Sequence, residues 1–331
     1  MYLDYFGLQK QPFGITLDTS LFFKGAERGD ILEAILYALN SGEGIIKVVG
    51  EVGSGKTMLS RMLTKKAADN TVFVFLLNPS IQAEQVLYAI AYDLGLKVDA
   101  SDQSIQVLHE LQKKLFELYK DGKKVVLIID EAQQMPLATL EEIRLLSNLE
   151  TETEKLLQII MFGQPELDKH IDTVEVRQLR ERITYSFYLN PLTWNLAETY
   201  LSFRLEKAGH QGRDIFKRSA IKKLTKYSDG TLRRLNVLAD KALLAAYLDK
   251  SAEVEPKHVK IALQEGNKRN DSGNTAYVMA FLSVVAVLLG VGAFYWFVQF
   301  QPVSLSGGAK QPIAVAIKED IKQEVVKADA R

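Results

Sequence analysis

The sequence predicts a doubly wound α/β domain, followed by a small all-helical domain and one membrane-spanning helix. Three observations indicate this order. Short apolar runs rich in β-branched residues alternate with helical patterns from residue 28 to residue 189. The strand pattern stops after Asn190-Pro191, and only helical patterns follow as far as residue 268. A long apolar stretch then occupies residues 276–298.

The composition is that of a globular protein. The chain has 331 residues, with 41 basic and 41 acidic side chains and no cysteine. This excludes disordered, collagen-like and disulfide-stapled classes. The length exceeds what one core usually supports, so about two domains are expected. Zero net charge gives no general argument for nucleic-acid binding, and the absence of cysteine excludes thiol nucleophiles and zinc–thiolate sites.

The first domain, residues 1–190, is expected to hold a parallel sheet. Its candidate strands are nearly all apolar and are separated by helical stretches, which is typical of a sheet covered by helices on both faces. The expected strands are residues 45–50, 71–78, 125–130, 156–163 and 183–189. The expected helices are residues 27–42, 56–69, 82–95, 103–120 and 137–150.

The second domain, residues 191–270, is expected to be helical. Its candidate helices are residues 194–208, 215–228, 231–248 and 256–265. Pro256 would open the last helix at a favourable first-turn position. The domain is rich in Lys and Arg, which suits a domain held near anionic lipid and also leaves nucleic-acid binding open.

Residues 276–298 are expected to cross a membrane, with a buried core helix as the alternative. No charged residue lies between Asp271 and Lys310. A helix over this stretch would be roughly 34 Å long, enough for a hydrocarbon core of about 30 Å. Tyr277 at one end and Trp296 near the other are typical of membrane interfaces.

Basic residues concentrate before the span, so the positive-inside rule predicts that residues 1–270 lie in the cytosol. The tail, residues 299–331, would then lie on the other side. It opens with Gly and Ser and ends in mixed charge, so we expect it to be mostly disordered. The N-terminus has neither a basic region nor a long apolar region, so we expect no cleavable signal peptide.

A phosphate-binding loop follows the first expected strand. Residues 50–57 read GEVGSGKT, which fits G-x-x-x-x-G-K-[ST] between a strand and a helix. The glycines would let backbone N–H groups wrap a nucleotide's phosphates, Lys56 would add a charge, and Thr57 would ligate Mg²⁺. The candidate nucleotide-binding residues are Gly50, Glu51, Val52, Gly53, Ser54, Gly55, Lys56, Thr57 and Met58.

Two acids end the strand in VVLIIDEAQ. Asp130 would hold the magnesium ion through a water, and Glu131 would polarise the water that attacks the terminal phosphate. The carboxyl end of a strand is where ligands bind in a doubly wound sheet. Two such acids alone are also typical of a solvated turn, but the phosphate loop upstream favours a hydrolytic site.

Further polar residues complete the expected site. Gln164 would project from a neighbouring strand toward the terminal phosphate, or it would only cap the next helix. Arg233 or Arg234, at a helix start in the second domain, would fold back onto bound phosphate. One of three arginines before the last strand would reach the nucleotide of a neighbouring subunit, unless they form a solvated face. These are Arg177, Arg180 and Arg182.

These elements together resemble the AAA+ ATPases of the GspA/ExeA type, membrane-anchored assembly factors of bacterial secretion and pilus systems. The resemblance covers about residues 1–298, and the motifs that carry it are MYLDYFGLQKQPFGIT, GEVGSGKT, LIIDEAQ, LLQIIMFGQPEL, VRQLRERITYSFYLNPLT and GTLRRLNVLADKAL. It implies a P-loop AAA+ fold with a helical lid. It also implies Gln164 as first sensor, Arg182 as arginine finger with Arg177 in reserve, and Arg233 as second sensor.

The chain departs from the family pattern twice. Leu232 stands where the family usually has a proline, and the tail is too short for the peptidoglycan-binding domain of longer members. What remains resembles the short MshM-type proteins of mannose-sensitive haemagglutinin (type IV) pilus biogenesis.

The resemblance implies an ATPase in the bacterial inner membrane, with a cytoplasmic ATPase domain and a periplasmic tail, that uses ATP and Mg²⁺. It would form a ring or dimer with itself, contact inner-membrane lipid, and drive or regulate assembly of a type IV pilus or type II secretion machine with other assembly proteins. Nucleic acid and peptidoglycan are not expected as direct partners. The alternatives are a nucleic-acid-handling ATPase and a scaffold that ATP only switches.

Overall fold

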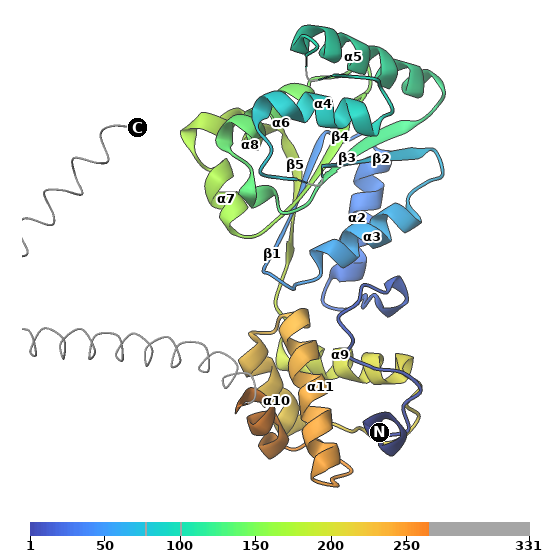
Figure 1. Cartoon of the computed structure of the whole chain (residues 1–331), viewed down its shortest axis with the longest axis vertical. Coiled ribbons are helices and arrows are strands. Elements are labelled where there is room, and N and C mark those ends of the chain that lie inside the picture. The colour runs from blue at the N-terminus through green and yellow to red at the C-terminus, as the bar shows by residue number, and fades with distance from the viewer. Residues whose placement is uncertain (77, 100, 265–331) are drawn as a thin grey trace, which may run out of the picture. The chain divides into compact units, whose positions relative to one another are not determined.

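The computed structural model describes residues 1–76, 78–99 and 101–264, which belong to one compact unit. Five strands form a single sheet in the order β2-β3-β4-β1-β5, and every neighbouring pair is parallel (Figure 1). The strands are β1 Ile45–Gly50, β2 Thr71–Leu76, β3 Lys124–Ile129, β4 Gln158–Gly163 and β5 Ile183–Leu189. The predicted parallel α/β sheet is therefore confirmed.

Helices cover both faces of the sheet (Figure 1). One face packs against α2 Arg28–Asn40 and α3 Lys56–Lys66, with strand residues such as Ile46 and Val48 in the shared core. The other face packs against helices α4 to α8, with Ile45 and Ile159 in that core. These helices are α4 Ala83–Asp93, α5 Ser104–Lys120, α6 Leu137–Leu146, α7 Glu166–Ile171 and α8 Arg177–Arg182.

Apolar side chains on both faces explain why the strands read as continuous apolar runs rather than alternating ones. Within the described residues, three short 3₁₀ helices join the elements, and they are η1 Thr19–Leu21, η2 Ala132–Gln134 and η3 Val174–Val176. Helix α6 ends at Leu146, earlier than the predicted residue 150. The residues that follow form a turn instead, in which Glu150 and Lys155 pair as an antiparallel bridge.

The strand order brings three carboxyl ends together. β4 lies between β1 and β3, with Val49 opposite Gly163 and Ile129 opposite Met161. The segments after β1, β3 and β4 therefore begin beside one another at the same edge of the sheet. Ligands bind at this edge in open α/β sheets.

A helical bundle follows the sheet. It contains α9 Trp194–Lys207, α10 Arg218–Ser228 and α11 Leu232–Leu248, and residues 256–264 are also helical. The N-terminal segment, including α1 Tyr2–Tyr5, shares the core of this bundle rather than that of the sheet. Phe6 and Phe13 lie in that core, and the Tyr2 hydroxyl donates a hydrogen bond of 2.6 Å to Asp240. The sequence places residues 1–190 in the α/β domain, whereas the core residues of this segment pack with the helices of the bundle.

The predicted membrane span, residues 276–298, and the tail, residues 299–331, lie outside the described residues. Among the residues that the structure describes, no helix has both the length and the apolar character to cross a bilayer.

Candidate nucleotide-binding site

The phosphate loop joins β1 to α3 and needs its glycines. Gly53 and Gly55 have φ angles of 79° and 106°, in the left-handed region that favours glycine. A Cβ on Gly53 would also lie 2.6 Å from the Cβ of Arg233. The loop opens directly into α3, whose first-turn N–H groups and helix dipole suit an anion. The local geometry therefore fits a nucleotide's phosphates.

Lys56 is buried at the base of this loop, with 5% of its surface exposed. Its Nζ donates hydrogen bonds to the carbonyls of Gly50, at 2.7 Å, and Glu51, at 3.3 Å. Burial lowers the pKa of the amine, and the carboxylates of Glu131 and Asp130 oppose that shift. The amine is thus held by weak neutral acceptors at a place where phosphate oxygens would bind it more strongly.

Thr57 and Asp130 meet across the site. The Thr57 hydroxyl donates to Asp130 Oδ2 at 3.3 Å, and the Glu131 amide donates to Oδ1 at 2.9 Å. Burial raises the pKa of Asp130 above its ordinary value, and these hydrogen bonds offset only part of that rise. This arrangement suits Mg²⁺, because the Thr57 hydroxyl would ligate the ion and Asp130 beside it would hold one of the waters that Mg²⁺ keeps. No group of three or more potential metal ligands was found in the described part of the chain.

Glu131 is positioned by two glutamines. Its Oε2 accepts hydrogen bonds from Gln133 Nε2 at 2.7 Å and from Gln164 Nε2 at 2.8 Å. The backbone N–H of Gln164 donates to Gln133 Oε1 at 3.0 Å. Burial would raise the pKa of Glu131, but the two side-chain hydrogen bonds lower it overall. The carboxylate is therefore ionised and oriented. The Gln164 side chain thus contacts the acid, and no side-chain cap is made at the start of α7. Its approach to a terminal phosphate stays a prediction.

A cavity of about 380 Å³ adjoins these groups. The phosphate-loop side includes Lys56, Thr57 and Glu131, and the far side is formed by the N-terminal segment and the helical bundle. Apolar side chains of that segment line it, and these are Ile15, Leu17, Leu21, Phe22 and Phe23. The polar side chains contributed by α9 and α11 are Tyr200, Arg204, Arg233 and Asn236. The cavity thus combines charged groups of the phosphate loop with apolar side chains of the N-terminal segment, which suits a nucleotide.

The structure separates the two candidate lid arginines. The Arg233 amide donates to the Gly53 carbonyl at 3.1 Å, and its side chain lines the cavity. Arg234 turns away, with an ion pair to Asp229 and a hydrogen bond of 3.1 Å to the Tyr227 carbonyl. Arg233 is thus the arginine next to the phosphate loop, despite Leu232 before it.

The three arginines of α8 are not brought to this site within the chain. Ile183, which follows Arg182, pairs with Ile45 at the start of β1, whereas the phosphate loop begins at the other end of that strand. Six strand residues separate the two places by roughly 20 Å. Arg177 instead pairs with Glu181 and Arg180 with Asp172, each at 3.2 Å.

Arg28 is a site residue that the sequence analysis missed. It is 3% exposed and donates to the carbonyl of Ser54 at 3.1 and 3.3 Å, and to those of Ala26 and Asn190 at 3.2 Å. It thus ties the phosphate loop to the segment that enters the helical bundle. Burial lowers the pKa of its guanidinium. Only its place at the start of a predicted helix was visible, and that position gives no signal of burial.

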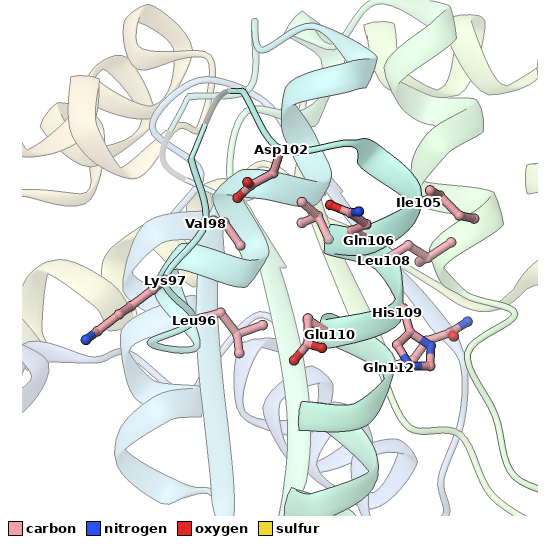
Figure 2. Close-up of a pocket in the computed structure, with 11 residues that line it drawn as sticks. Leu96, Lys97, Val98, Asp102, Ile105, Gln106, Leu108, His109, Glu110 and Gln112 are labelled. Atoms are coloured by element: carbon pink, nitrogen blue, oxygen red, sulfur yellow. The ribbon is translucent and has the colours of Figure 1, made fainter.

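A second, larger hollow of about 830 Å³ lies along α5 and the segment that precedes it (Figure 2). Leu96, Val98, Ile105 and Leu108 supply apolar surface, and Figure 2 shows Lys97 directed away from α5. None of the predicted site residues lines it. Asp102, His109 and Glu110 all line it, but among the described residues they do not form a group that could hold a metal ion.

Comparison with known proteins agrees with this geometry. Residues 39–171 match the family described as an AAA domain. The General secretion pathway protein A of Aeromonas hydrophila is 34% identical to this chain over 297 residues, or 89% of the chain. The chain thus contains an AAA domain and is similar to a GspA protein. It spans about half the length of this relative, because the match covers 54% of that protein.

Solved structures share the fold of this chain. The Aeropyrum pernix ORC2 protein, as ADPNP–ADP complexes, aligns with a TM-score of 0.56 at 15% identity, over 78% of this chain and 71% of that chain. The Pyrobaculum aerophilum Cdc6p aligns with a TM-score of 0.55 at 16% identity, over 76% and 72%. Such low identity shows a common AAA+ fold and nothing of function.

Proposed function

We propose that this chain is a GspA-type AAA+ ATPase, which binds ATP with Mg²⁺ and hydrolyses it. The observation that carries the proposal is the convergence of Lys56, Thr57, Asp130 and the Glu131–Gln164 pair at one edge of the sheet, beside the cavity. A phosphate loop alone supports binding. The ionised, doubly hydrogen-bonded carboxylate next to it supports hydrolysis as well.

Each residue has a distinct part in this reaction. The loop amides and the start of α3 bind the phosphates, and Lys56 exchanges its carbonyl partners for phosphate oxygens. Mg²⁺, held near Thr57 and Asp130, neutralises charge on the phosphates when it is bound. Glu131 orients the attacking water and accepts its proton. Gln164 keeps that carboxylate in place, and Arg233 stabilises phosphate charge from the cavity wall.

The protein works as a ring or dimer in this proposal. Arg182 lies at the edge of the sheet away from its own phosphate loop, so it is suited only to a neighbouring subunit's nucleotide. Its charge would stabilise the transition state there. Arg177 and Arg180 already have carboxylate partners in the same chain, and this supports Arg182 as the finger.

The cellular role in this proposal is assembly of a secretion machine or type IV pilus at the bacterial inner membrane. The support is the similarity to General secretion pathway protein A and the apolar stretch at residues 276–298, which would anchor the protein. The ATPase part would lie in the cytoplasm and the tail in the periplasm. Within this role, the nearness to MshM-type pilus proteins remains a prediction from the sequence.

The test is nucleotide turnover by the purified full chain in detergent. Wild type should hydrolyse ATP, Lys56→Ala should bind no ATP, and Glu131→Gln should bind ATP without turning it over. Glu152→Gln, a matched change at an exposed position, should behave as wild type. Undiminished hydrolysis by Glu131→Gln would reject the assigned base. Turnover that depends steeply on added DNA would favour the nucleic-acid-handling alternative.

A further inference from the structure

A buried chain of hydrogen bonds runs through the wall of the nucleotide cavity. It begins at Arg204 on α9, whose guanidinium donates to the carbonyls of Pro12, at 2.6 Å, and Gly14, at 3.1 Å. The same guanidinium donates to the Tyr200 hydroxyl at 2.9 Å. Tyr200 in turn bonds Asn236 Oδ1 on α11 at 2.8 Å. The chain thus joins the N-terminal segment to two helices of the bundle.

The direction of every bond in this chain is fixed by its first member. A guanidinium has only donors, so the Tyr200 oxygen must accept from Arg204. Burial raises the pKa of Tyr200, so the hydroxyl keeps its single proton. That proton is donated to Asn236 Oδ1.

The opposite orientation of the asparagine amide is disfavoured. With oxygen and nitrogen exchanged, two donors would point at the Tyr200 oxygen, and the hydroxyl proton would lose its partner. Tyr200 is only 2% exposed, so no bulk water would replace that partner, and an unsatisfied buried donor is costly. Arg204 therefore fixes the orientation of Asn236 through Tyr200.

This orientation leaves the Asn236 Nδ2 amino group as a donor. Asn236 is 7% exposed and lines the cavity, and within residues 1–264 as described no hydrogen bond from its Nδ2 occurs. The amino group is not among the fully enclosed polar atoms that lack a partner, so it faces the open space of the cavity. The N-terminal segment lines the same cavity, so whatever occupies this space can supply the acceptor.

The position along α11 shows which part of a nucleotide would supply the acceptor. Arg233 contacts the phosphate loop through its backbone amide, and Asn236 follows three residues later, about one helical turn or roughly 5 Å further from the phosphates. Ile15, Leu17 and Phe22 line the same cavity and offer an apolar surface for a flat ring. Phosphates and base would thus be bound by different turns of one helix.

We propose that Asn236 reads the nucleobase of the bound nucleotide by donating to an unprotonated ring nitrogen of adenine, and that Tyr200 and Arg204 position it. Asparagine pairs well with adenine, which presents ring-nitrogen acceptors. This inference rests on the proposed ATP binding and adds the group that recognises the base. Tyr200 is a positioning residue here, because it acts only through Asn236.

The test measures dissociation constants of the full-length protein for ATP and for its 1-deaza, 3-deaza and 7-deaza analogues. Each analogue replaces one ring nitrogen by C–H and keeps the triphosphate. Wild type should bind one of the three about three- to tenfold more weakly than ATP, the usual value of one hydrogen bond. Asn236→Asp keeps an acceptor for Tyr200 but removes the donor, so it should weaken ATP binding and abolish that difference.

Tyr200→Phe gives a second measurement with less risk to folding, because it removes only the hydroxyl. It should reduce the distinction between ATP and the sensitive analogue while affinity for inorganic triphosphate stays within about twofold of wild type. Asn195→Asp and Tyr227→Phe carry the same chemical changes at exposed positions. They should change neither the preference for ATP over the sensitive analogue nor the affinity for inorganic triphosphate.

The outcomes separate this inference from the proposed function. Wild-type binding of ATP with equal affinity for all three analogues would overturn the role of Asn236 and leave ATP binding in place. A difference that persists in Asn236→Asp would also overturn it. Failure of the wild-type protein to bind ATP in the same titration would reject the proposed function and this inference together.

Discussion

The Gln164 side chain donates a hydrogen bond of 2.8 Å to the carboxylate of Glu131, although 33 positions separate the two residues in the chain. The bond exists because β4, which ends at Gly163, lies beside β3, which ends at Ile129. Glu131 itself has a left-handed backbone, with φ of 53°, which is rare outside glycine and directs the chain sharply away from the strand. The candidate base and the candidate sensor therefore form one unit.

Replacing Gln164 should lower turnover more than binding. Gln164→Leu removes one of the two donors that orient the Glu131 carboxylate, and it leaves the contacts of Lys56 unchanged. We expect kcat to fall by about 10- to 100-fold while the dissociation constant for ATP changes less than about threefold. Steady-state kinetics and equilibrium binding measure the two effects. Gln112→Leu on α5 is a matched control away from the site. A loss confined to binding would contradict the assigned role.

Substitution of Gly53 should separate the cost of its left-handed backbone from the cost of a collision with Arg233. Gly53 and Gly42 have nearly equal φ angles, 79° and 80°, but only Gly53 has a neighbour, the Cβ of Arg233, against which a new Cβ would collide. Gly42→Ala should cost about 1 kcal/mol from its backbone alone. Gly53→Ala should cost more, because α11 has to move, and it should also weaken ATP binding. Thermal unfolding with and without ATP measures both, and equal losses in the two variants would show that the Arg233 contact yields at no cost.

A partly buried ion pair between β1 and α7 should stabilise the fold more than the exposed ion pairs do. Lys47, almost fully buried in β1, pairs with Asp168 of α7 and lies 5.7 Å from the Tyr188 ring centroid. Asp168→Asn should lower stability by about 2 kcal/mol, or roughly 4 to 8 °C in a domain of this size, because it leaves a buried ammonium without its counter-ion. Asp172→Asn breaks an exposed pair with Arg180 and should cost less than about 1 kcal/mol.

The double replacement Lys47→Met with Asp168→Leu checks the cause of that loss. Because no charge is then left without a partner, most of the stability should return. A double variant as unstable as Asp168→Asn alone would show that packing, and not the uncompensated charge, is responsible. The comparison uses thermal midpoints in one buffer, since the salt concentration alters the exposed pair more than the buried one.

The sequence predicted the strands and the phosphate loop because both are local patterns. Runs of apolar residues depend only on burial along one strand, and the loop motif places Lys56 and Thr57 at fixed spacing after β1. The acid pair was found for the same reason, because Asp130 directly follows an apolar strand. Strand order was not readable, since it depends on which strands meet after the chain has crossed the sheet.

What could not be predicted depends on contacts between distant segments. Asn236 and Tyr200 read as ordinary helical residues, and only the packing of α9 against α11 joins them. The N-terminal aromatic residues belong to a motif of the family resemblance, and that motif does not indicate their structural role. Their place in the core of the helical bundle depends on contacts with residues far away in the sequence. Arg204 is buried in the structure. In the sequence, a buried polar residue of a helix looks the same as an exposed one, so Arg204 gave no signal.

Mixed assemblies test whether Arg182 acts on a neighbouring subunit. Arg182→Ala supplies an intact nucleotide site without a finger, and Lys56→Ala supplies a finger without a nucleotide site. Each alone should be nearly inactive, since finger arginines contribute about 10³- to 10⁵-fold to turnover. Mixing them should restore activity in those subunits that have an Arg182-bearing neighbour. The restored fraction should vary with the mixing ratio and reach its maximum near equal amounts.

The same experiment with Arg177→Ala in place of Arg182→Ala tests whether Arg177, the reserve candidate, is the arginine finger instead of Arg182. Arg177 pairs with Glu181 on the exposed side of α8, so its loss should leave activity within about threefold of wild type. If the Arg182 mixture shows no recovery while both variants still associate by analytical ultracentrifugation, the arginine does not act between subunits. If Arg177→Ala is the inactive variant, and it recovers on mixing, the finger is Arg177, and α8 must then present its other face to the neighbouring nucleotide.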